Sequence, residues 1–155
     1  MATEEQKKAR QMKLFNEVIF GLAKGMWELF GEGAYATATE VGEEIIEEME
    51  HDMGLEIHGE NPQDILTELE RIYVDELGGA KLADIKIKDD RIDVLIEDCI
   101  LLHACRDLQK EGIRPFTCIP MMLAAGALRE RLGLKERVDN IAIEGNKCDI
   151  DFIMM

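Results

Sequence analysis

Two different spacings of hydrophobic residues divide the chain into helices and strands. From Thr3 to Phe30 apolar side chains recur every three or four residues, including Met12, Val18 and Leu22, while the early charges fall on the other side. This spacing predicts one long amphipathic helix. Glycines within its second half are costly in a helix, at about 1 kcal/mol each relative to alanine, which favours close packing against another helix or a break near Gly31.

Two further helices are predicted before the spacing changes. The stretch YATATEVGEEIIEEMEHDMG (35–54) places Val41, Ile45, Ile46 and Met49 inward and a dense run of glutamates toward solvent. The stretch GENPQDILTELERIYVDELGG (59–79) opens with an N-cap asparagine and a proline at the first helical position, and it ends at paired glycines. These signals indicate helices in both segments.

A spacing of two then predicts strands. Residues 82–88 and 91–97 alternate apolar and polar side chains on both sides of an Asp89–Asp90 turn, as in a β-hairpin. Two helices follow, in 99–112 and 117–133. The segments VDNIAIEG (138–145) and KCDIDFIMM (147–155) alternate again around Gly145 and Asn146 and predict a second hairpin.

This order favours an α+β fold, with helices packed on one face of a four-stranded antiparallel sheet built from two β-hairpins. A length of 155 residues, of which 46% are hydrophobic, is suited to one core, so residues 1–155 are expected to form a single domain.

The formal charge of −15 excludes nucleic acid and anionic membrane surfaces as expected partners. No apolar run reaches the length of a membrane helix, and the first residues lack the apolar core of a secretory signal. A cytoplasmic protein without membrane insertion is therefore expected.

An enzyme is not expected. The chain contains no serine, no phosphate loop, no HExxH and no dinucleotide fingerprint. Of its three histidines, His51 and His58 flank a loop among acids, where solvation is the simpler interpretation.

The cysteines are the strongest candidates for chemistry. Cys99, His103, Cys105, Cys118 and Cys148 could supply the four sulfur or nitrogen donors of a zinc site if the fold brings them together, although their spacings match no known zinc knuckle. Free cysteines more often pack as small apolar side chains. Cys118 begins a predicted helix, where the helix N-terminus can lower a thiol pKa and favour a redox or acylation role.

Methionines point to a different kind of site. Met121 and Met122 lie in the apolar helix after Cys118, and Met154 and Met155 end the chain. Thioether side chains line adaptable apolar pockets, whereas core packing is the alternative interpretation.

The segment FTCIPMMLAAGALRERLGLKERVDNIAIEGNKCDIDFIM resembles the closing half of the 4-vinyl reductase domain, also called a hydrocarbon-binding domain. The matching positions are Cys118, Ala125, Gly126, Gly133, Cys148 and Phe152, and residues 27–117 fit more loosely. Such domains share a fold with TRAPP trafficking-complex core subunits and haem-nitric-oxide sensors. The resemblance implies an α+β ligand-binding domain, often dimeric, for a small apolar or metal-linked ligand.

Three hypotheses result. The first is a non-catalytic binding or sensory domain whose small apolar ligand contacts Cys118, Met121, Met122, Ala125 and Phe152. The second is a zinc-binding or redox-responsive regulator that uses the four cysteines and His103. The third is a structural adaptor that forms a homodimer through the first helix, residues 1–30, at Gly21 and Gly25.

Overall fold

The computed structural model describes all residues from 1 to 155, and they form five α-helices and one sheet. The helices are α1 (Glu4–Phe30), α2 (Thr37–His51), α3 (Pro62–Arg71), α4 (Leu102–Lys110) and α5 (Ile119–Leu132). A 3-10 turn, η1 (Gly31–Ala36), follows α1, and a π turn, η2 (Ile72–Glu76), follows α3. The strands are β1 (Leu82–Lys88), β2 (Arg91–Glu97), β3 (Glu136–Glu144) and β4 (Lys147–Met154).

The sheet confirms the two predicted hairpins and shows how they join. β1 pairs with β2 around Asp89, and β3 pairs with β4 around Gly145, both antiparallel and with positive φ at these turn residues. β2 and β4 also pair antiparallel, so the strand order is β1-β2-β4-β3. The bounds differ from the prediction in one place that matters below, since β3 begins at Glu136 rather than at Val138.

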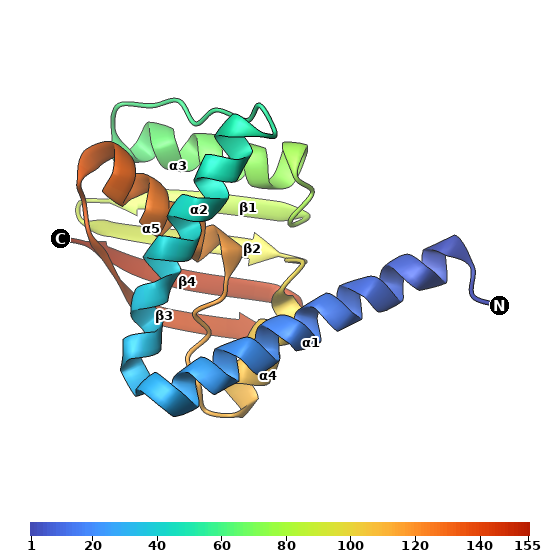
Figure 1. Ribbon diagram of the computed structural model, residues 1–155. Coiled ribbons are helices and arrows are strands. Elements are labelled where there is room, and N and C mark those ends of the chain that lie inside the picture. The colour runs from blue at the N-terminus through green and yellow to red at the C-terminus, as the bar shows by residue number, and fades with distance from the viewer.

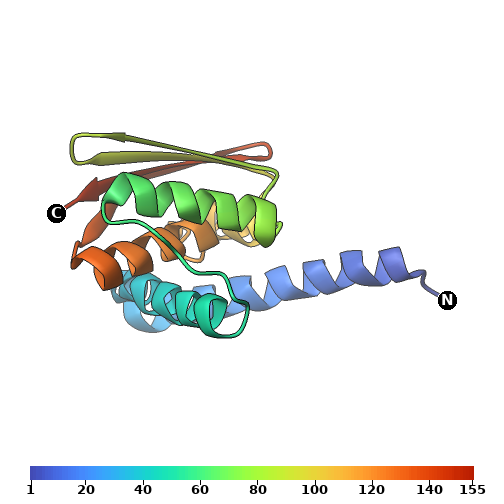
Figure 2. The same ribbon diagram turned by 90° about the horizontal axis from the view of Figure 1, so that it is seen from above.

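All helices lie on one face of the sheet, as predicted, and the other face is open (Figures 1 and 2). α5 lies in the middle of the molecule, in extensive contact with α2 (Figure 1). Every residue of α5 from Met121 to Leu128 is buried, which explains why this helix is apolar all round rather than amphipathic. The core continues into β2 and β4, where Ile92, Ile150 and Phe152 are fully buried.

Glycines set the close contact between α2 and α5. A Cβ atom on Gly42 would lie 1.8 Å from the carbonyl oxygen of Met122, and one on Gly126 would lie 2.7 Å from the backbone nitrogen of Glu43. Nearby, the Arg129 guanidinium bonds the Glu43 carboxylate at 2.6 Å. The two helices therefore pack backbone against backbone, with an ion pair at the edge.

The first helix buries only part of its predicted apolar stripe, together with a polar residue. Asn16 and Ala23 are buried and Ile19 packs against the core, whereas Val18 and Leu22 are 50% and 62% exposed. The Asn16 amide donates to the Ile100 carbonyl at 2.9 Å and accepts from the Ala104 backbone N–H at 3.0 Å. α4 has no side-chain cap of its own, so Asn16 caps it from a neighbouring helix. None of the helices combines the length and the apolar content needed to cross a membrane.

Candidate functional site

A cavity of about 250 Å³ lies between the start of α2, the loop before α5, α5 itself and β3. We call it the Glu136 cavity. Its lining includes Tyr35, Phe116, Met121, Ala125, Glu136 and Val138. A second space, between α3, α5, β1 and β2 beside Tyr73, measures only about 20 Å³, which is room for about one water molecule. Of the two, only the Glu136 cavity can admit a small organic molecule.

The Glu136 carboxyl group is the unusual feature of this cavity. Glu136 opens β3 two residues before Val138, so the alternation of the strand turns both side chains toward the helices. Its Oε2 atom is buried and has no hydrogen-bond partner. Burial raises the pKa of Glu136 to about 8, because a charged carboxylate loses its hydration there. At pH 7 the carboxyl group is therefore mostly neutral and can donate a hydrogen bond.

Aromatic residues and one arginine form the other wall. The Tyr35 ring lies 5.6 Å from the Phe116 ring and 5.4 Å from the Trp27 ring, between centroids. The guanidinium carbon of Arg114 lies 4.1 Å from the centroid of the Tyr35 ring, a cation–π contact. Arg114 is exposed and has no carboxylate within ion-pair distance. The cavity thus has an apolar wall, a buried acid and two arginines without an ion-pair partner, Arg114 and Arg137.

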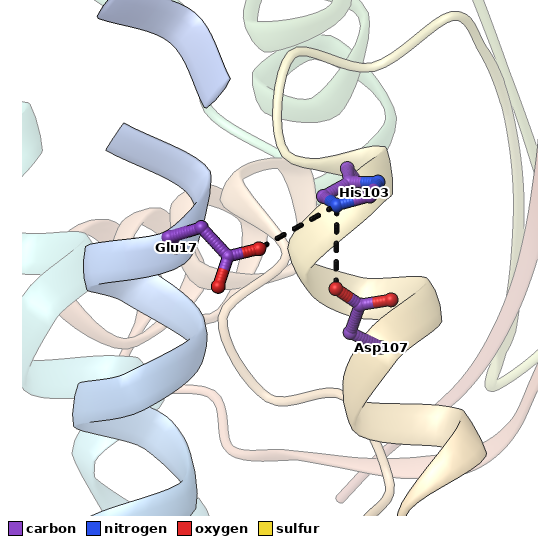
Figure 3. Close-up of side chains that lie close together, drawn as sticks. All are labelled: Glu17, His103 and Asp107. Atoms are coloured by element: carbon purple, nitrogen blue, oxygen red, sulfur yellow. Dashed lines mark ion pairs between the residues drawn. The ribbon is translucent and has the colours of Figure 1, made fainter. Parts of the chain in front are cut away.

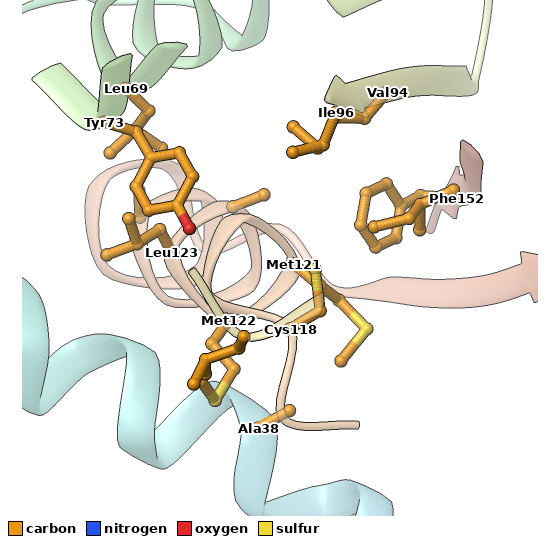
Figure 4. Packing of buried hydrophobic residues seen from close by; sticks show 14 of the residues in the cluster. Ala38, Leu69, Tyr73, Val94, Ile96, Cys118, Met121, Met122, Leu123 and Phe152 are labelled. Carbon is orange, nitrogen blue, oxygen red and sulfur yellow. The ribbon is translucent and has the colours of Figure 1, made fainter. Parts of the chain in front are cut away.

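The residues predicted to contact a ligand separate into two groups. Met121 and Ala125 line the Glu136 cavity. Cys118, Met122 and Phe152 are buried but are not among its lining residues; Figure 4 shows Met122 beside α2 and Phe152 on the sheet side of α5. The helix identified from sequence therefore contributes to the cavity, but through one face only.

The cysteines lie in or beside the core, and their surroundings shift the thiol pKa values in both directions, since the contact with Cys118 lowers the pKa of Cys148. Burial raises the pKa of Cys105 to about 12. The pKa of Cys118 also rises, first because its thiol donates to Cys148 and then because it is buried. The lowering expected from the start of α5 is therefore outweighed. Cys99 lies 3.0 Å from the Tyr73 hydroxyl, between sulfur and oxygen, and burial raises its pKa as well.

His103 lies apart from the thiols. The helix expected to include Cys99 begins only at Leu102, so Cys99 and His103 do not share a helical face. His103 is exposed, and its Nε2 atom lies 3.6 Å from Glu17 Oε1 on α1 and 3.3 Å from Asp107 Oδ2 one turn along α4 (Figure 3). Such spacings suit either an ion-paired imidazolium or a divalent cation.

Two groups of donors are close enough for a metal ion. Besides Glu17, His103 and Asp107, the open face of the sheet carries Asp93, Asp149 and Asp151, each group having its ligand atoms within 4.8 Å of one another. The Asp149 carboxyl bonds Asp93, and this contact raises the pKa of Asp149 to about 6. The cysteines form no such group. Zinc binding by the cysteines and His103 stays a prediction.

Glu136, Arg114 and Tyr35 were missed by sequence reasoning. Extending the strand alternation two residues toward the N-terminus, from Val138 to Glu136, would have placed that acid on the core face. Nothing local marks Arg114 or Tyr35, because the loop and the turn that bring them together are far apart in the sequence.

Comparison with solved structures shows the class of fold. The chain is similar to trafficking protein particle complex subunit 3 from Naegleria fowleri, with a TM-score of 0.58 and 9% sequence identity. In that crystal structure the subunit is covalently bound to palmitic acid. The alignment covers 95% of this chain and 96% of that one. The expected relation to the fold of the trafficking-complex subunits is thus confirmed, and at this identity it concerns the fold alone.

Comparison with protein families gives the narrower assignment. The model of the putative rubredoxin C-terminal domain matches residues 12–153, and the chain belongs to that family. No curated protein shows a significant match.

Proposed function

We propose that this protein is a non-catalytic binding or sensory domain that holds a small, mostly apolar molecule in the Glu136 cavity. The observation that carries the proposal is a cavity of about 250 Å³ whose only acid has a buried, unpartnered carboxyl oxygen. Buried polar groups are normally hydrogen-bonded, since leaving one unpaired costs about 1 to 3 kcal/mol. A ligand that bonds Glu136 and fills the apolar space would remove that cost.

Two likenesses support this proposal. The segment from Phe116 to Met154 resembles the 4-vinyl reductase, or hydrocarbon-binding, domain. The trafficking subunit of similar fold is covalently bound to palmitic acid. Both associate this architecture with apolar molecules. Glu136 has a pKa suited to acid–base chemistry, but the cavity lining supplies neither histidine nor cysteine to act with it as a second base or a nucleophile, and we therefore favour binding over catalysis.

Fluorescence titration of Trp27, the one tryptophan of the chain, tests the proposal because its ring contacts Tyr35 at the cavity wall. We expect at least one of octanoate, 1-octanol and octylamine to give a saturable change in wild-type protein. Ala125→Leu should abolish it, since Ala125 lines the cavity and the larger side chain occupies the ligand's space. Failure of all three ligands to bind, or equal binding to the Ala125→Leu variant, would refute the proposal.

We also propose that the protein forms a homodimer through α1. The outward side of this helix carries large apolar side chains at helical spacing; Leu14, Val18, Leu22 and Leu29 are 66%, 50%, 62% and 78% exposed. Contiguous exposed apolar surface of this kind is typical of a protein–protein contact. The adjoining glycines, Gly21 and Gly25, have no atom within 4 Å of a Cβ position, so a second helix could approach closely there.

Sedimentation of wild type and Leu22→Glu tests the dimer. We expect wild type to sediment as a dimer at micromolar concentration and the variant as a monomer, because a buried unpaired carboxylate opposes association. Lys8→Glu, at another exposed position of α1, is the control and should remain dimeric. A monomeric wild type would contradict this second proposal.

A further inference from the structure

Two arginines at the Glu136 cavity have no ion-pair partner. Nine of the 18 basic residues pair with a carboxylate, as Arg71 and Arg129 do, and neither Arg114 nor Arg137 is among them. Arg114 is exposed, has no such partner and lies over the ring of Tyr35, a cavity-lining residue. An unpaired guanidinium at a cavity is a ready site for an anionic oxygen pair, which it can bind through two parallel N–H groups.

Glu136 also favours a ligand that carries hydrogen-bond acceptors. Burial is the only cause of its raised pKa, so no neighbouring charge keeps it ionised. In its neutral form the carboxyl group offers one O–H donor inside the cavity. Arg114 and Glu136 therefore both offer hydrogen-bond donors at pH 7, and a ligand that supplies acceptors can satisfy both.

We infer that the ligand of the Glu136 cavity is a small organic carboxylate: its oxygens accept hydrogen bonds from Arg114 and from the Glu136 carboxyl group, and its apolar body packs against Phe116 and Met121. This inference rests on the proposed binding function and names the chemical class of the ligand. An aliphatic or aromatic body suits the lining, in which apolar and aromatic side chains predominate.

Two other head groups fit less well. An amine is protonated at pH 7 and would face the positive charge of Arg114, and an ion pair with Glu136 would require ionisation of a carboxyl group that burial keeps neutral. An alcohol would satisfy Glu136 but would leave the guanidinium without an anionic partner. The carboxylate is the head group that uses both residues.

The affinity of the cavity for a carboxylate should fall as the pH rises. The charged and titratable residues that line the cavity are Tyr35 from η1, Arg114 from the loop, and Glu136 and Arg137 from β3. A ligand carboxylate stays ionised above about pH 5, and arginine stays protonated throughout. As the pH rises through about 8, Glu136 ionises, loses its donor and repels the ligand. Affinity should therefore fall between pH 7 and pH 9.

Calorimetric titration with three ligands that differ only in the head group tests the inference. At pH 7 we expect wild type to bind octanoate at least about tenfold more tightly than 1-octanol or octylamine, the factor typical of one charge-assisted hydrogen bond. Arg114→Gln should lose about tenfold in octanoate affinity and leave 1-octanol affinity unchanged. Arg10→Gln makes the same change of charge on α1, away from the cavity, and should bind all three ligands as wild type does.

The pH dependence of octanoate binding tests the role of Glu136 separately from that of Arg114. We expect wild type to lose about tenfold in octanoate affinity between pH 7 and pH 9, and Glu136→Gln to lose almost none, because the amide keeps a donor and cannot ionise. Equal affinity for 1-octanol and octanoate, or an octanoate affinity that Arg114→Gln leaves intact, would overturn the carboxylate inference while leaving the binding function in place. Binding of none of the three ligands would overturn both.

Discussion

Replacing Glu136 with glutamine should change how the free energy of unfolding depends on pH. The pKa of Glu136 rises from the usual 4.5 to about 8 in the folded protein. Between those values the folded protein holds a proton at Glu136 that the unfolded chain has released, so the free energy of unfolding falls as the pH rises. The loss begins near pH 4.5 and is complete just above pH 8, because beyond that point both states are ionised.

The magnitude follows from the difference between the two pKa values. At about 1.4 kcal/mol per pH unit, the gap corresponds to a loss of about 5 kcal/mol in wild type. Water entry and small side-chain movements around the carboxylate reduce this cost. We therefore expect Glu136→Gln to be about 2 to 4 kcal/mol more stable than wild type at pH 9, and within about 1 kcal/mol of it at pH 5.

Urea unfolding at pH 5, 7 and 9, followed by circular dichroism on protein refolded from denaturant, measures the difference free of any copurified ligand. Glu144→Gln is the matched control, since Glu144 ends the same strand and is exposed. The control should change the unfolding free energy by less than about 0.5 kcal/mol at each pH. A difference between Glu136→Gln and wild type that is the same at pH 5 and pH 9 would refute the reasoning.

Three further experiments test the packing and the thiols. Gly42→Ala should cost at least about 3 kcal/mol of unfolding free energy, because its Cβ would meet the Met122 carbonyl oxygen. Gly21→Ala, whose Cβ meets no atom of its own chain, should gain up to about 1 kcal/mol at concentrations too low for the proposed dimer; equal effects of the two changes in urea unfolding would contradict the close contact of α2 and α5. Asn16→Ala should cost about 1 to 3 kcal/mol and speed hydrogen exchange at the first turn of α4, and an unchanged exchange rate there would refute the capping role. The thiols of native protein should react with a disulfide reagent at pH 8 far more slowly than in urea, since burial raises the pKa of Cys105 to about 12. Fast reaction of all four thiols in the native protein would contradict their burial. Near-stoichiometric zinc in protein purified without chelator would instead support a metal site formed by the cysteines.

Local signals were sufficient for most of the fold. Asn61 accepts from the Asp64 backbone N–H and caps α3, and the turn at Asp89 and Asp90 joins two strands with the predicted bounds. Such features depend on neighbours within a few residues, so the sequence determines them directly. The pairing of β2 with β4 brings together residues that are 50 to 62 positions apart, and no local pattern specifies it.

The first helix shows what the spacing of apolar residues does not decide. Its apolar stripe includes Val18, Ile19 and Leu22, and the spacing alone does not mark which of them reaches the core. The structure exposes Val18 and Leu22, packs Ile19 against the core and buries Asn16, because the asparagine side chain satisfies backbone groups of α4 that would otherwise lack partners. A polar residue at a helix junction cannot be recognised before its partner is known.

Only part of the candidate site could be predicted, because the remaining residues gain their meaning from partners that the folded chain brings together. Met121 and Ala125 belong to an apolar helix whose likeness to a known family is visible in the sequence. Glu136 is one of 33 acidic residues, and its significance comes from burial and from the lack of a hydrogen-bond partner, which are properties of the folded chain. Arg114 likewise becomes informative only once the folded chain places it over Tyr35 at the cavity, without an ion-pair partner.

Native mass spectrometry of freshly purified protein would show whether the Glu136 cavity holds a ligand. We expect each wild-type chain to carry one small non-covalent molecule that is released on denaturation, and Ala125→Leu to carry none, because its side chain fills the Glu136 cavity. Wild-type protein whose native mass equals that of the chain alone, and stays so after addition of octanoate, 1-octanol or octylamine, would contradict the proposed binding function.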